Sequence, residues 1–276
     1  GRGDEALGWQ LTLALYGVVA VVLFATVFAT TRERIAPPPQ QRSDVKQDFR
    51  DLLDNRPWLV LFTLALVIMI TIVMRSGATV YYLKYYVGQP ELIGAFLGIY
   101  SVALAVGAAL TPLMTRFVDK KHLMVFLMAT VGVLSCAMYF VPRDMIWLMF
   151  VVNILIGLAL GPKSPLAFSM YADCADYTEW KTGRRATALT FSAATFSQKL
   201  GGALASAAIA WVLAGMGYVA NQAQSNASQT GILLLLTVIP GVVAFVAALV
   251  MRAYPLDDAA LAGMQDTLAQ RRAQEA

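Results

Sequence analysis

Residues 57–87 read PWLVLFTLALVIMITIVMRSGATVYYLKYYV and carry no charged side chain before Arg75. About 20 predominantly apolar residues suffice for an α-helix to cross the hydrocarbon core of a bilayer. The run lacks the alternating pattern of a membrane β-strand, and a helix satisfies its own backbone hydrogen bonds, which a lipid environment demands. This stretch therefore predicts a transmembrane helix.

The same pattern recurs along the chain. Hydrophobic residues make up 58% of it and charged residues only 14%, whereas a soluble domain carries about 25% charged residues. This composition excludes a soluble enzyme, a disordered chain, a disulfide-stapled secreted domain and a nucleic-acid binder. The predicted fold class is an all-α, polytopic helical bundle in a lipid bilayer. Its seven predicted spans are Gly8–Thr30, Pro57–Val87, Leu92–Phe117, Leu123–Val141, Met145–Tyr171, Ala188–Ala214 and Thr230–Arg252.

The lysines and arginines predict the orientation of these spans, because cytoplasmic loops carry the excess of both. Only Arg2, Lys84 and Arg143 lie on the other side, so the net charge of +4 is mainly an insertion signal. The C-terminus is therefore expected in the cytoplasm. The segments after the first, third, fifth and seventh spans hold Arg32, Arg34, Arg42, Lys46, Arg50, Arg56, Arg116, Lys120, Lys121, Lys181, Arg184, Arg185, Arg252, Arg271 and Arg272.

The loops divide the chain into unequal parts. A linker with Pro37-Pro38-Pro39 runs into a predicted surface helix around Ser43–Asn55 and separates one span from a block of six. After Pro255, an apolar face of Leu261, Met264 and Leu268 predicts a short amphipathic surface helix. The chain begins at Gly1 without Met, so we expect a fragment. The predicted parts are a helix in 1–31, a cytoplasmic loop in 32–56, a six-helix block in 57–254 and a cytoplasmic tail in 255–276.

Lys199 is the most informative charge in the spans. An ionisable side chain within the membrane costs at least ~2.5–3.5 kcal/mol, so it marks a functional candidate. At 1.5 Å per residue from Ala188, it lies about 17 Å into the bilayer, close to the midplane. The alternative is a lysine paired with a carboxylate only to hold helices together. At 3-4-3-4 spacing it shares a helix face with Ser192, Thr195, Gly202 and Ser206.

Arg75 is a second candidate, about two thirds of the way to the outer face. Its face also carries Thr71, Thr79 and Tyr82, and a guanidinium suits a carboxylate or several hydroxyls. The alternative is snorkelling toward the outer interface. For Lys163, near the cytoplasmic interface, snorkelling is the favoured interpretation.

The run Gly157-x-x-x-Gly161-Pro162-Lys163-Ser164-Pro165 predicts a broken helix, because two prolines remove two backbone donors. Broken helices at membrane depth line cavities in transporters; the alternative is a kink used only for packing. Asn153 and Ser164 share a face with both glycines. The candidate lining residues of a substrate or cation site are thus Lys199, Thr195, Ser192, Arg75, Tyr82, Asn153 and Ser164.

The spans contain no intramembrane Asp or Glu, and Glu91 sits at a boundary. Every deep charge is cationic, so the carboxylates of a cation-coupled site must come from elsewhere, or the chain handles anions. No nucleophile–base pair and no metal-ligand spacing is present, so we expect neither an enzyme, a metal site nor a bound cofactor. Cys136 and Cys174 are too far apart in depth to pair.

One long motif carries a family resemblance. Residues 172–187 read ADCADYTEWKTGRRAT, and residues 196–202 read FSQKLGG. They closely resemble the glycoside–pentoside–hexuronide:cation symporters, the melibiose-permease-like branch of the major facilitator superfamily. Residues 81–85 and 161–166 also look like this family. The resemblance covers the second half of such a carrier: the first span looks like helix six, the linker like the middle loop, and the rest like helices seven to twelve.

This resemblance implies symport of a small sugar, glycoside or pentoside, by alternating access in a bacterial inner membrane. Lys199 matches the family's mid-membrane lysine, where the sugar and cation sites meet, and Thr195 lies close to the cation site. The coupling cation would be Na⁺, H⁺ or Li⁺, and the carboxylates that bind it would lie in a missing N-terminal half. Melibiose permease carries an aromatic residue that packs on the sugar where this chain has Ser164.

The charges of the long motif indicate a cytoplasmic gate. Carboxylates and guanidiniums at one helix junction can pair with the middle loop or the other half and break when the carrier switches. The alternative is a solvated loop with topogenic charges. Two other functions remain open: a carrier for a lysolipid-like amphiphile, and a non-transporting membrane sensor or scaffold on the same fold. The predicted gate residues are Asp173, Asp176, Glu179, Arg184 and Arg185.

Overall fold

The computed structural model describes residues 5–31, 45–183 and 187–275, and within these ranges every regular element is a helix. The predicted all-α class is therefore confirmed. The chain divides into two compact units, Gly1–Ser43 and Asp44–Ala276, which we describe separately.

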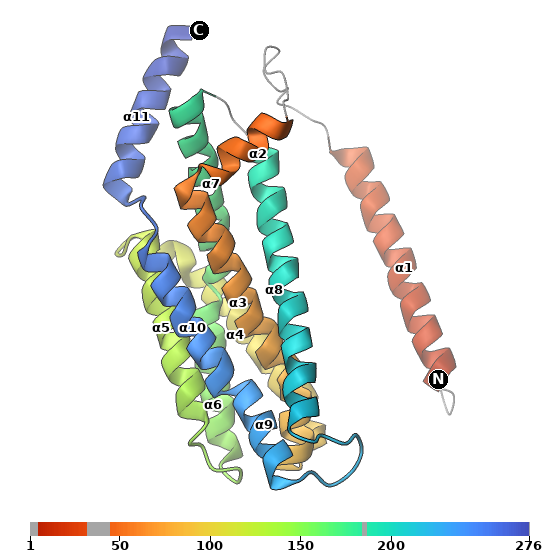
Figure 1. The fold of residues 1–276 in the computed structure, drawn as a ribbon. Helices are drawn as coiled ribbons and strands as arrows, with labels where there is room; N and C mark the ends of the chain where they lie inside the picture. Colours follow the sequence, from red (N-terminus) through yellow and green to blue (C-terminus); the bar gives the residue numbers. More distant parts are fainter. Residues whose placement is uncertain (1–4, 32–44, 184–186, 276) are drawn as a thin grey trace. The chain divides into compact units, whose positions relative to one another are not determined.

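The first unit contains helix α1 (Glu5–Thr30), drawn in red in Figure 1. Leu7–Thr30 is long and apolar enough to cross a membrane, and none of its most apolar window is buried within the protein. A helix that is apolar on all sides and unburied has the surface of a membrane span. It corresponds to the first predicted span.

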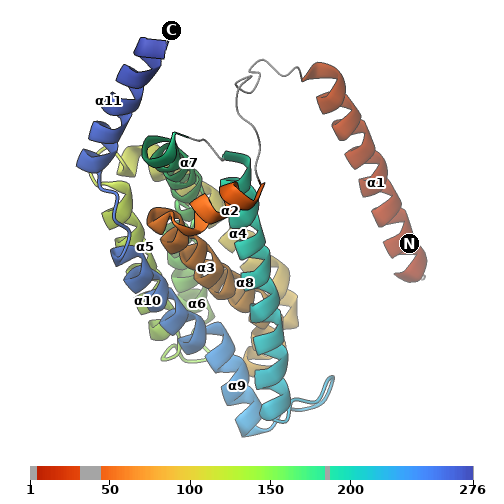
Figure 2. The same ribbon diagram turned by 45° about the horizontal axis from the view of Figure 1, so that its top comes forward.

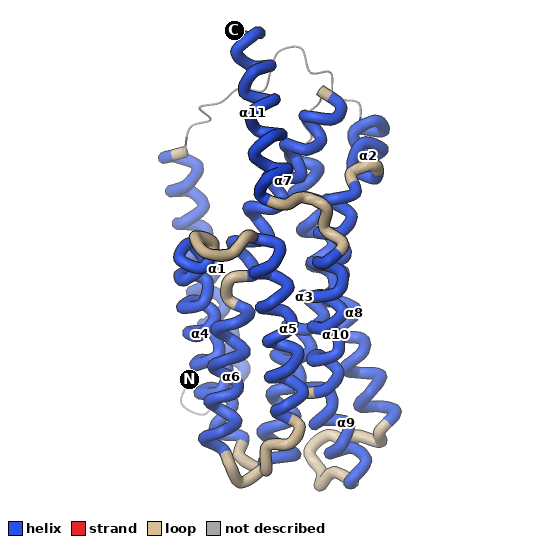
Figure 3. The backbone as a smooth tube through the Cα atoms, turned by 90° about the vertical axis from the view of Figure 1, so that its left-hand side faces the viewer, coloured by secondary structure: helices blue, strands red, loops and turns tan. Residues whose placement is uncertain are grey.

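The second unit is a bundle of long helices that run side by side, with loops at the two ends (Figure 3). Helix α3 lies between α8 and α10 (Figure 2), α4 packs against α6, and α5 packs against α10. Its elements are α2 (Val45–Leu53), α3 (Arg56–Tyr81), η1 (Tyr82–Val87), η2 (Pro90–Leu92), α4 (Ile93–Met114), α5 (Lys120–Met138), α6 (Ile146–Leu160), α7 (Lys163–Thr182), α8 (Thr187–Gly215), α9 (Asn226–Leu236), α10 (Val238–Arg252) and α11 (Asp258–Glu275).

Six of the seven predicted spans are long and apolar enough to cross a membrane within the described residues. The remaining one, Ala188–Ala214, forms α8, which has 29 residues and so reaches about 43 Å. Its length suffices, but its apolar content does not, because polar residues such as Ser192, Gln198 and Lys199 interrupt it. The six stretches are Leu7–Thr30, Arg56–Val87, Pro90–Met114, Lys120–Met138, Ile146–Thr182 and Asn226–Arg252.

The predicted break in the fifth span is confirmed. Helix α6 ends at Leu160 and α7 begins at Lys163. Gly161 still donates its backbone N–H to Gly157, at 2.9 Å, but Pro162 has no N–H to continue the ladder. Gly161 also lies where a Cβ would overlap the backbone of α4 at Leu104 and Gly107. The break therefore coincides with the close approach of two helices.

A second break interrupts the last span between α9 and α10. Thr237 leaves helical geometry, with φ −115° and ψ −85°. Pro240 follows three residues later and lacks the N–H that would bond to the Leu236 carbonyl, four residues before it. The carbonyl of Leu236 is therefore left without its helical partner.

The two surface helices predicted outside the spans are both present. The surface helix expected around Ser43–Asn55 is α2, and its expected N-cap, Ser43, lies outside the described residues. The expected tail helix is α11, which packs on α7. Its apolar face of Leu261, Met264 and Leu268 is buried, with exposed fractions of 8%, 5% and 5%.

Candidate functional site

The polar stripe of α8 faces away from the bundle. Its buried face includes Ser197 and Gly201: the Ser197 hydroxyl donates to the Phe62 carbonyl of α3 at 2.5 Å, and Gly201 lies against the Leu66 backbone. This packing turns the opposite face outward. Exposed on that face are Ser192, Thr195, Lys199 and Ser206.

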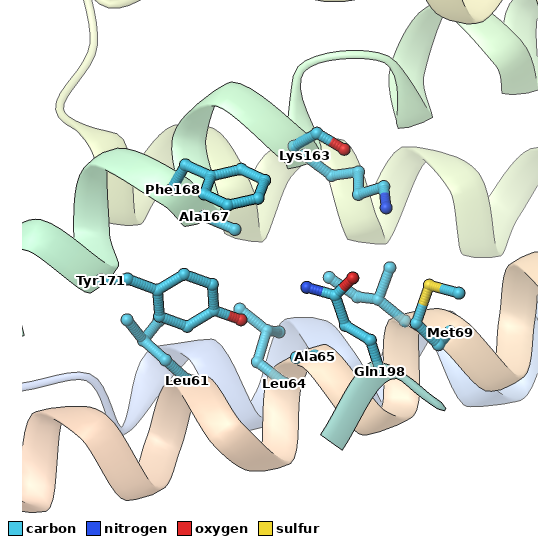
Figure 4. Close-up of a pocket in the computed structure, with 11 residues that line it drawn as sticks. Leu61, Leu64, Ala65, Met69, Lys163, Ala167, Phe168, Tyr171 and Gln198 are labelled. Carbon is cyan, nitrogen blue, oxygen red and sulfur yellow. The ribbon is translucent and has the colours of Figure 1, made fainter. Parts of the chain in front are cut away.

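A cleft opens beside this stripe, between α3, α7 and α8 (Figure 4). It offers about 30 Å³ to the centre of a water-sized sphere. Its α3 wall is apolar, whereas α7 and α8 contribute polar and aromatic groups. The lining residues are Leu61, Leu64, Ala65, Ile68, Met69, Lys163, Ser164, Ala167, Phe168, Tyr171 and Gln198.

Lys163 projects into this cleft. Figure 4 shows its ammonium group, the Gln198 amide and the Tyr171 ring directed into the same space. Phe168 and Tyr171 lie edge to face, with ring centroids 6.2 Å apart. The helix break at Gly161–Pro162 sets the start of α7 and therefore places Lys163 and Ser164 at the head of the cleft.

The sequence analysis missed Phe168, Tyr171 and Gln198. A signal was present, because Ser164, Ala167, Phe168 and Tyr171 follow the break at the spacing of one helix face. Gln198 belongs to α8 and directly precedes Lys199, so it links the cleft to the edge of the polar stripe.

Arg75 lies in a different place, inside the bundle, with only 2% of its surface exposed. One guanidinium nitrogen donates to the Ser135 hydroxyl of α5 at 3.2 Å and to the Leu236 carbonyl at 2.9 Å. The other donates to the Asn153 amide oxygen of α6 at 3.4 Å. Arg75 does not snorkel; it satisfies the carbonyl that the α9–α10 break sets free.

Two further predicted residues surround this arginine. The Asn153 amide also donates to the Phe96 carbonyl of α4, at 3.0 Å. The Tyr82 hydroxyl, fully buried, donates to the sulfur of Met149 at 3.4 Å. The structure thus brings Arg75, Asn153 and Tyr82 together, and places Ser164 in the cleft and Lys199, Thr195 and Ser192 on the outer face of α8.

The predicted gate residue Asp173 forms an ion pair between two helices. The Lys120 ammonium at the start of α5 lies 2.7 Å from the Asp173 carboxylate of α7, whose side chain is 8% exposed. Asp176 and Glu179 follow on α7, and both have polar or electrostatic partners. Arg184 and Arg185 lie outside the described residues.

Asp119 organises the neighbouring loop. Its carboxylate caps α5 by accepting the backbone N–H of His122 at 2.8 Å. Burial raises the pKa of Asp119, but hydrogen bonds from the backbone and side chain of His122 outweigh it, so this pKa lies below its usual range. Among the described residues, no three His, Cys, Asp or Glu side chains are grouped to hold a metal ion, and Cys136 and Cys174 are free thiols.

Comparison with known proteins places these features in a family. A family model described as MFS/sugar transport protein matches residues 1–258. The chain is similar to the inner membrane symporter YicJ of Escherichia coli strain K12, with 34% identity over 92% of this chain and 55% of the relative.

Two other relatives agree. The putative glycoside/cation symporter YagG of Escherichia coli strain K12 is 31% identical over 99% of this chain and 60% of the relative. The isoprimeverose transporter of Lactiplantibacillus pentosus is 32% identical over 100% of this chain and 57% of the relative. The chain therefore spans between 55% and 60% of the length of these relatives.

Proposed function

Because the chain belongs to the MFS/sugar transport protein family, we propose that it forms the C-terminal part of a sugar:cation symporter that works by alternating access. The remainder of the carrier, a bundle N-terminal to this chain, supplies the other wall of the transport path. The names of the similar symporters support this class of cargo and coupling.

The observation that carries the proposal is the exposed lysine on α8. Lys199 is twelve residues from the start of α8, or about 18 Å along it, and it faces away from its own bundle. A cation at this depth against lipid tails is strongly disfavoured. Protein or a water-filled path must therefore cover the stripe, and the missing part of a carrier provides both.

The cleft of Figure 4 supplies the chemistry that a small sugar needs. Phe168 and Tyr171 offer aromatic faces for the apolar face of a sugar ring, and Lys163, Ser164 and Gln198 offer groups that hydrogen-bond to hydroxyls. The sugar thus lies between this cleft and the opposite half. Lys199 and Thr195 stand at the boundary, where carboxylates of the other half hold Na⁺, H⁺ or Li⁺.

The charges at the cytoplasmic end act as the inner gate. Asp173 is tied to Lys120 within this chain, and we assign Asp176, Glu179, Arg184 and Arg185 to the same gate, whose charges exchange partners with the other half when the carrier switches. With the Lys and Arg excess on the same side, the C-terminus lies in the cytoplasm of a bacterial cell, and the carrier lies in its inner membrane.

The test is cation-driven uptake of a labelled glycoside or pentoside into right-side-out vesicles that contain the protein from the complete gene. Lys199→Ala abolishes uptake driven by a Na⁺ or H⁺ gradient, while the amount of protein in the membrane is unchanged. Arg116→Ala, which removes one exposed cytoplasmic cation, is the matched control and retains uptake. Normal gradient-driven uptake by Lys199→Ala contradicts the assignment.

A further inference from the structure

We propose that a small cavity between α3, α4 and α6 binds a monovalent anion of halide size next to Arg75. The cavity is lined by Arg75, Ser76, Thr79, Phe96, Leu97, Tyr100 and Asn153. It is separate from the sugar cleft, since the cleft contacts α3 only up to Met69. The inference does not depend on the proposed transport function.

Two buried donors in this cavity have no partner. The Nε of Arg75 and the hydroxyl of Tyr100 are shielded from solvent and make no hydrogen bond within the described part of the chain. Both residues are more than nine-tenths buried, with exposed fractions of 2% and 7%. An orphaned buried donor is costly and rare, and two such donors in one cavity indicate a missing acceptor.

The charge of Arg75 also lacks compensation. Its hydrogen-bond partners, the Ser135 hydroxyl, the Leu236 carbonyl and the Asn153 amide, are all neutral. The ionisable neighbours that act on it electrostatically are Tyr100 and Tyr82. A buried cation without a counter-ion is strongly disfavoured, so the occupant that best fits is an anion.

The size of the cavity limits that anion. It offers about 10 Å³ to the centre of a water-sized sphere, close to the ~10–15 Å³ that one bound water requires. A halide such as chloride fits this space and accepts hydrogen bonds on every side. A water molecule fits too, but it leaves the positive charge of Arg75 uncompensated.

The cavity is reachable from the surface of the bundle. Ser76 and Leu97 are half-buried, whereas the other lining residues are buried, so the opening lies between α3 and α4. The bound anion holds Arg75 in place, and Arg75 in turn holds the free Leu236 carbonyl at the α9–α10 break. Anion binding therefore stabilises the packing of α3 against α9.

The experiment is thermal unfolding of the purified protein from the complete gene, in detergent at constant ionic strength. Sodium chloride replaces sodium methanesulfonate, whose anion is too bulky for the cavity. We expect Tm to rise by roughly 2 °C or more and to saturate with chloride, because a ligand that binds only the folded state stabilises it. Sodium bromide should reproduce the rise.

Two variants tie the effect to the cavity. Tyr100→Phe keeps the ring and removes the orphaned hydroxyl, so the chloride concentration at half-effect rises by about 10-fold. Arg75→Gln abolishes the rise, and if that variant does not fold, Tyr100→Phe alone decides. Lys84→Gln removes an exposed cation that bonds to Asn221, and it leaves the chloride response unchanged.

Two results overturn the proposal. Equal Tm values in chloride and methanesulfonate mean that water alone fills the cavity. A chloride response of unchanged midpoint in Tyr100→Phe means that the effect arises elsewhere. Loss of sugar uptake, by contrast, bears only on the transport proposal.

Discussion

The packing of α8 on α3 determines which face of α8, and therefore Lys199, is exposed. Replacing Gly201 with alanine adds one methyl group at this contact and tests it. Gly201 is buried in this contact, and a Cβ added there overlaps the Leu66 carbonyl oxygen and lies 3.1 Å from the Leu66 Cα. The next residue, Gly202, is a matched control. Its added Cβ meets only the Val73 side chain, at 3.5 Å, which is ordinary van der Waals contact.

The expected difference follows from terms that partly cancel. Replacing glycine by alanine inside a helix gains about 1 kcal/mol in propensity, and this gain applies to both positions. Gly201→Ala also pays the overpacking cost of about 1–3 kcal/mol, because the colliding atom belongs to the backbone and cannot rotate away. The two variants should therefore differ by about 1–3 kcal/mol in the free energy of unfolding.

Thermal unfolding of the purified protein measures this difference. At about 2–4 °C per kcal/mol for 150–250 residues, Gly201→Ala should melt about 2–12 °C below Gly202→Ala. Because Gln198, which lines the cleft, lies on the same helix as Gly201, Gly201→Ala should also raise the KM for sugar uptake, whereas Gly202→Ala should not. If Gly201→Ala melts with or above Gly202→Ala, the packing of α8 on α3 is not as described, and the outward direction of Lys199 loses its basis.

Two further predictions concern the end of the bundle at which α2 meets α7 and α5 begins. Asn55 caps α3 by accepting the Trp58 N–H at 2.9 Å, and its amide donates to the Cys174 carbonyl at 2.9 Å and the Thr178 hydroxyl at 2.8 Å. Asn55→Ala should therefore lower the free energy of unfolding by about 2–4 kcal/mol. Thermal unfolding compares it with Ser101→Ala, and equal Tm values for the two variants refute a stabilising role of these three bonds. A double-mutant cycle of Lys120→Gln and Asp173→Asn should give a coupling of about 0.5–3 kcal/mol, and strictly additive effects refute the ion pair.

Much of the fold was predictable because it depends on local patterns. Apolar runs give the helices, and the prolines around Gly161 give the break before Lys163. Pro240 was an equally good signal for the second break. We did not predict that break, because Pro240 lies in a strongly apolar run that has the pattern of a single span. For α8 the sequence prediction went further than the structure supports. We predicted a span there, but the polar residues of α8 leave it less apolar than the six helices that qualify as candidate spans.

The partners of the buried cations were not predictable, because they are distant in sequence. Arg75 bonds to groups 60, 78 and 161 residues away, and only tertiary packing brings these together. Spacing along the second predicted span placed Tyr82 on the same face as Arg75, but it could not reveal the free carbonyl of Leu236. For the same reason, Asp173 was assigned to a gate without its partner Lys120.

In the sequence, Lys199 and Arg75 are the same kind of feature, a cation deep in a membrane span. In the structure they differ in their surroundings, because Lys199 is exposed and Arg75 is buried. Lys199 lies on the exposed face of α8, so under the transport proposal its partner belongs to the opposite half, and removing the lysine should affect coupling while the bundle stays folded. Arg75 lies inside, where its fixed partners are neutral, so its balance must enter the bundle itself. Replacing each cation in turn therefore tests the two proposed roles separately: Lys199→Ala tests coupling through the opposite half of the carrier, and Arg75→Gln tests the stability of this half.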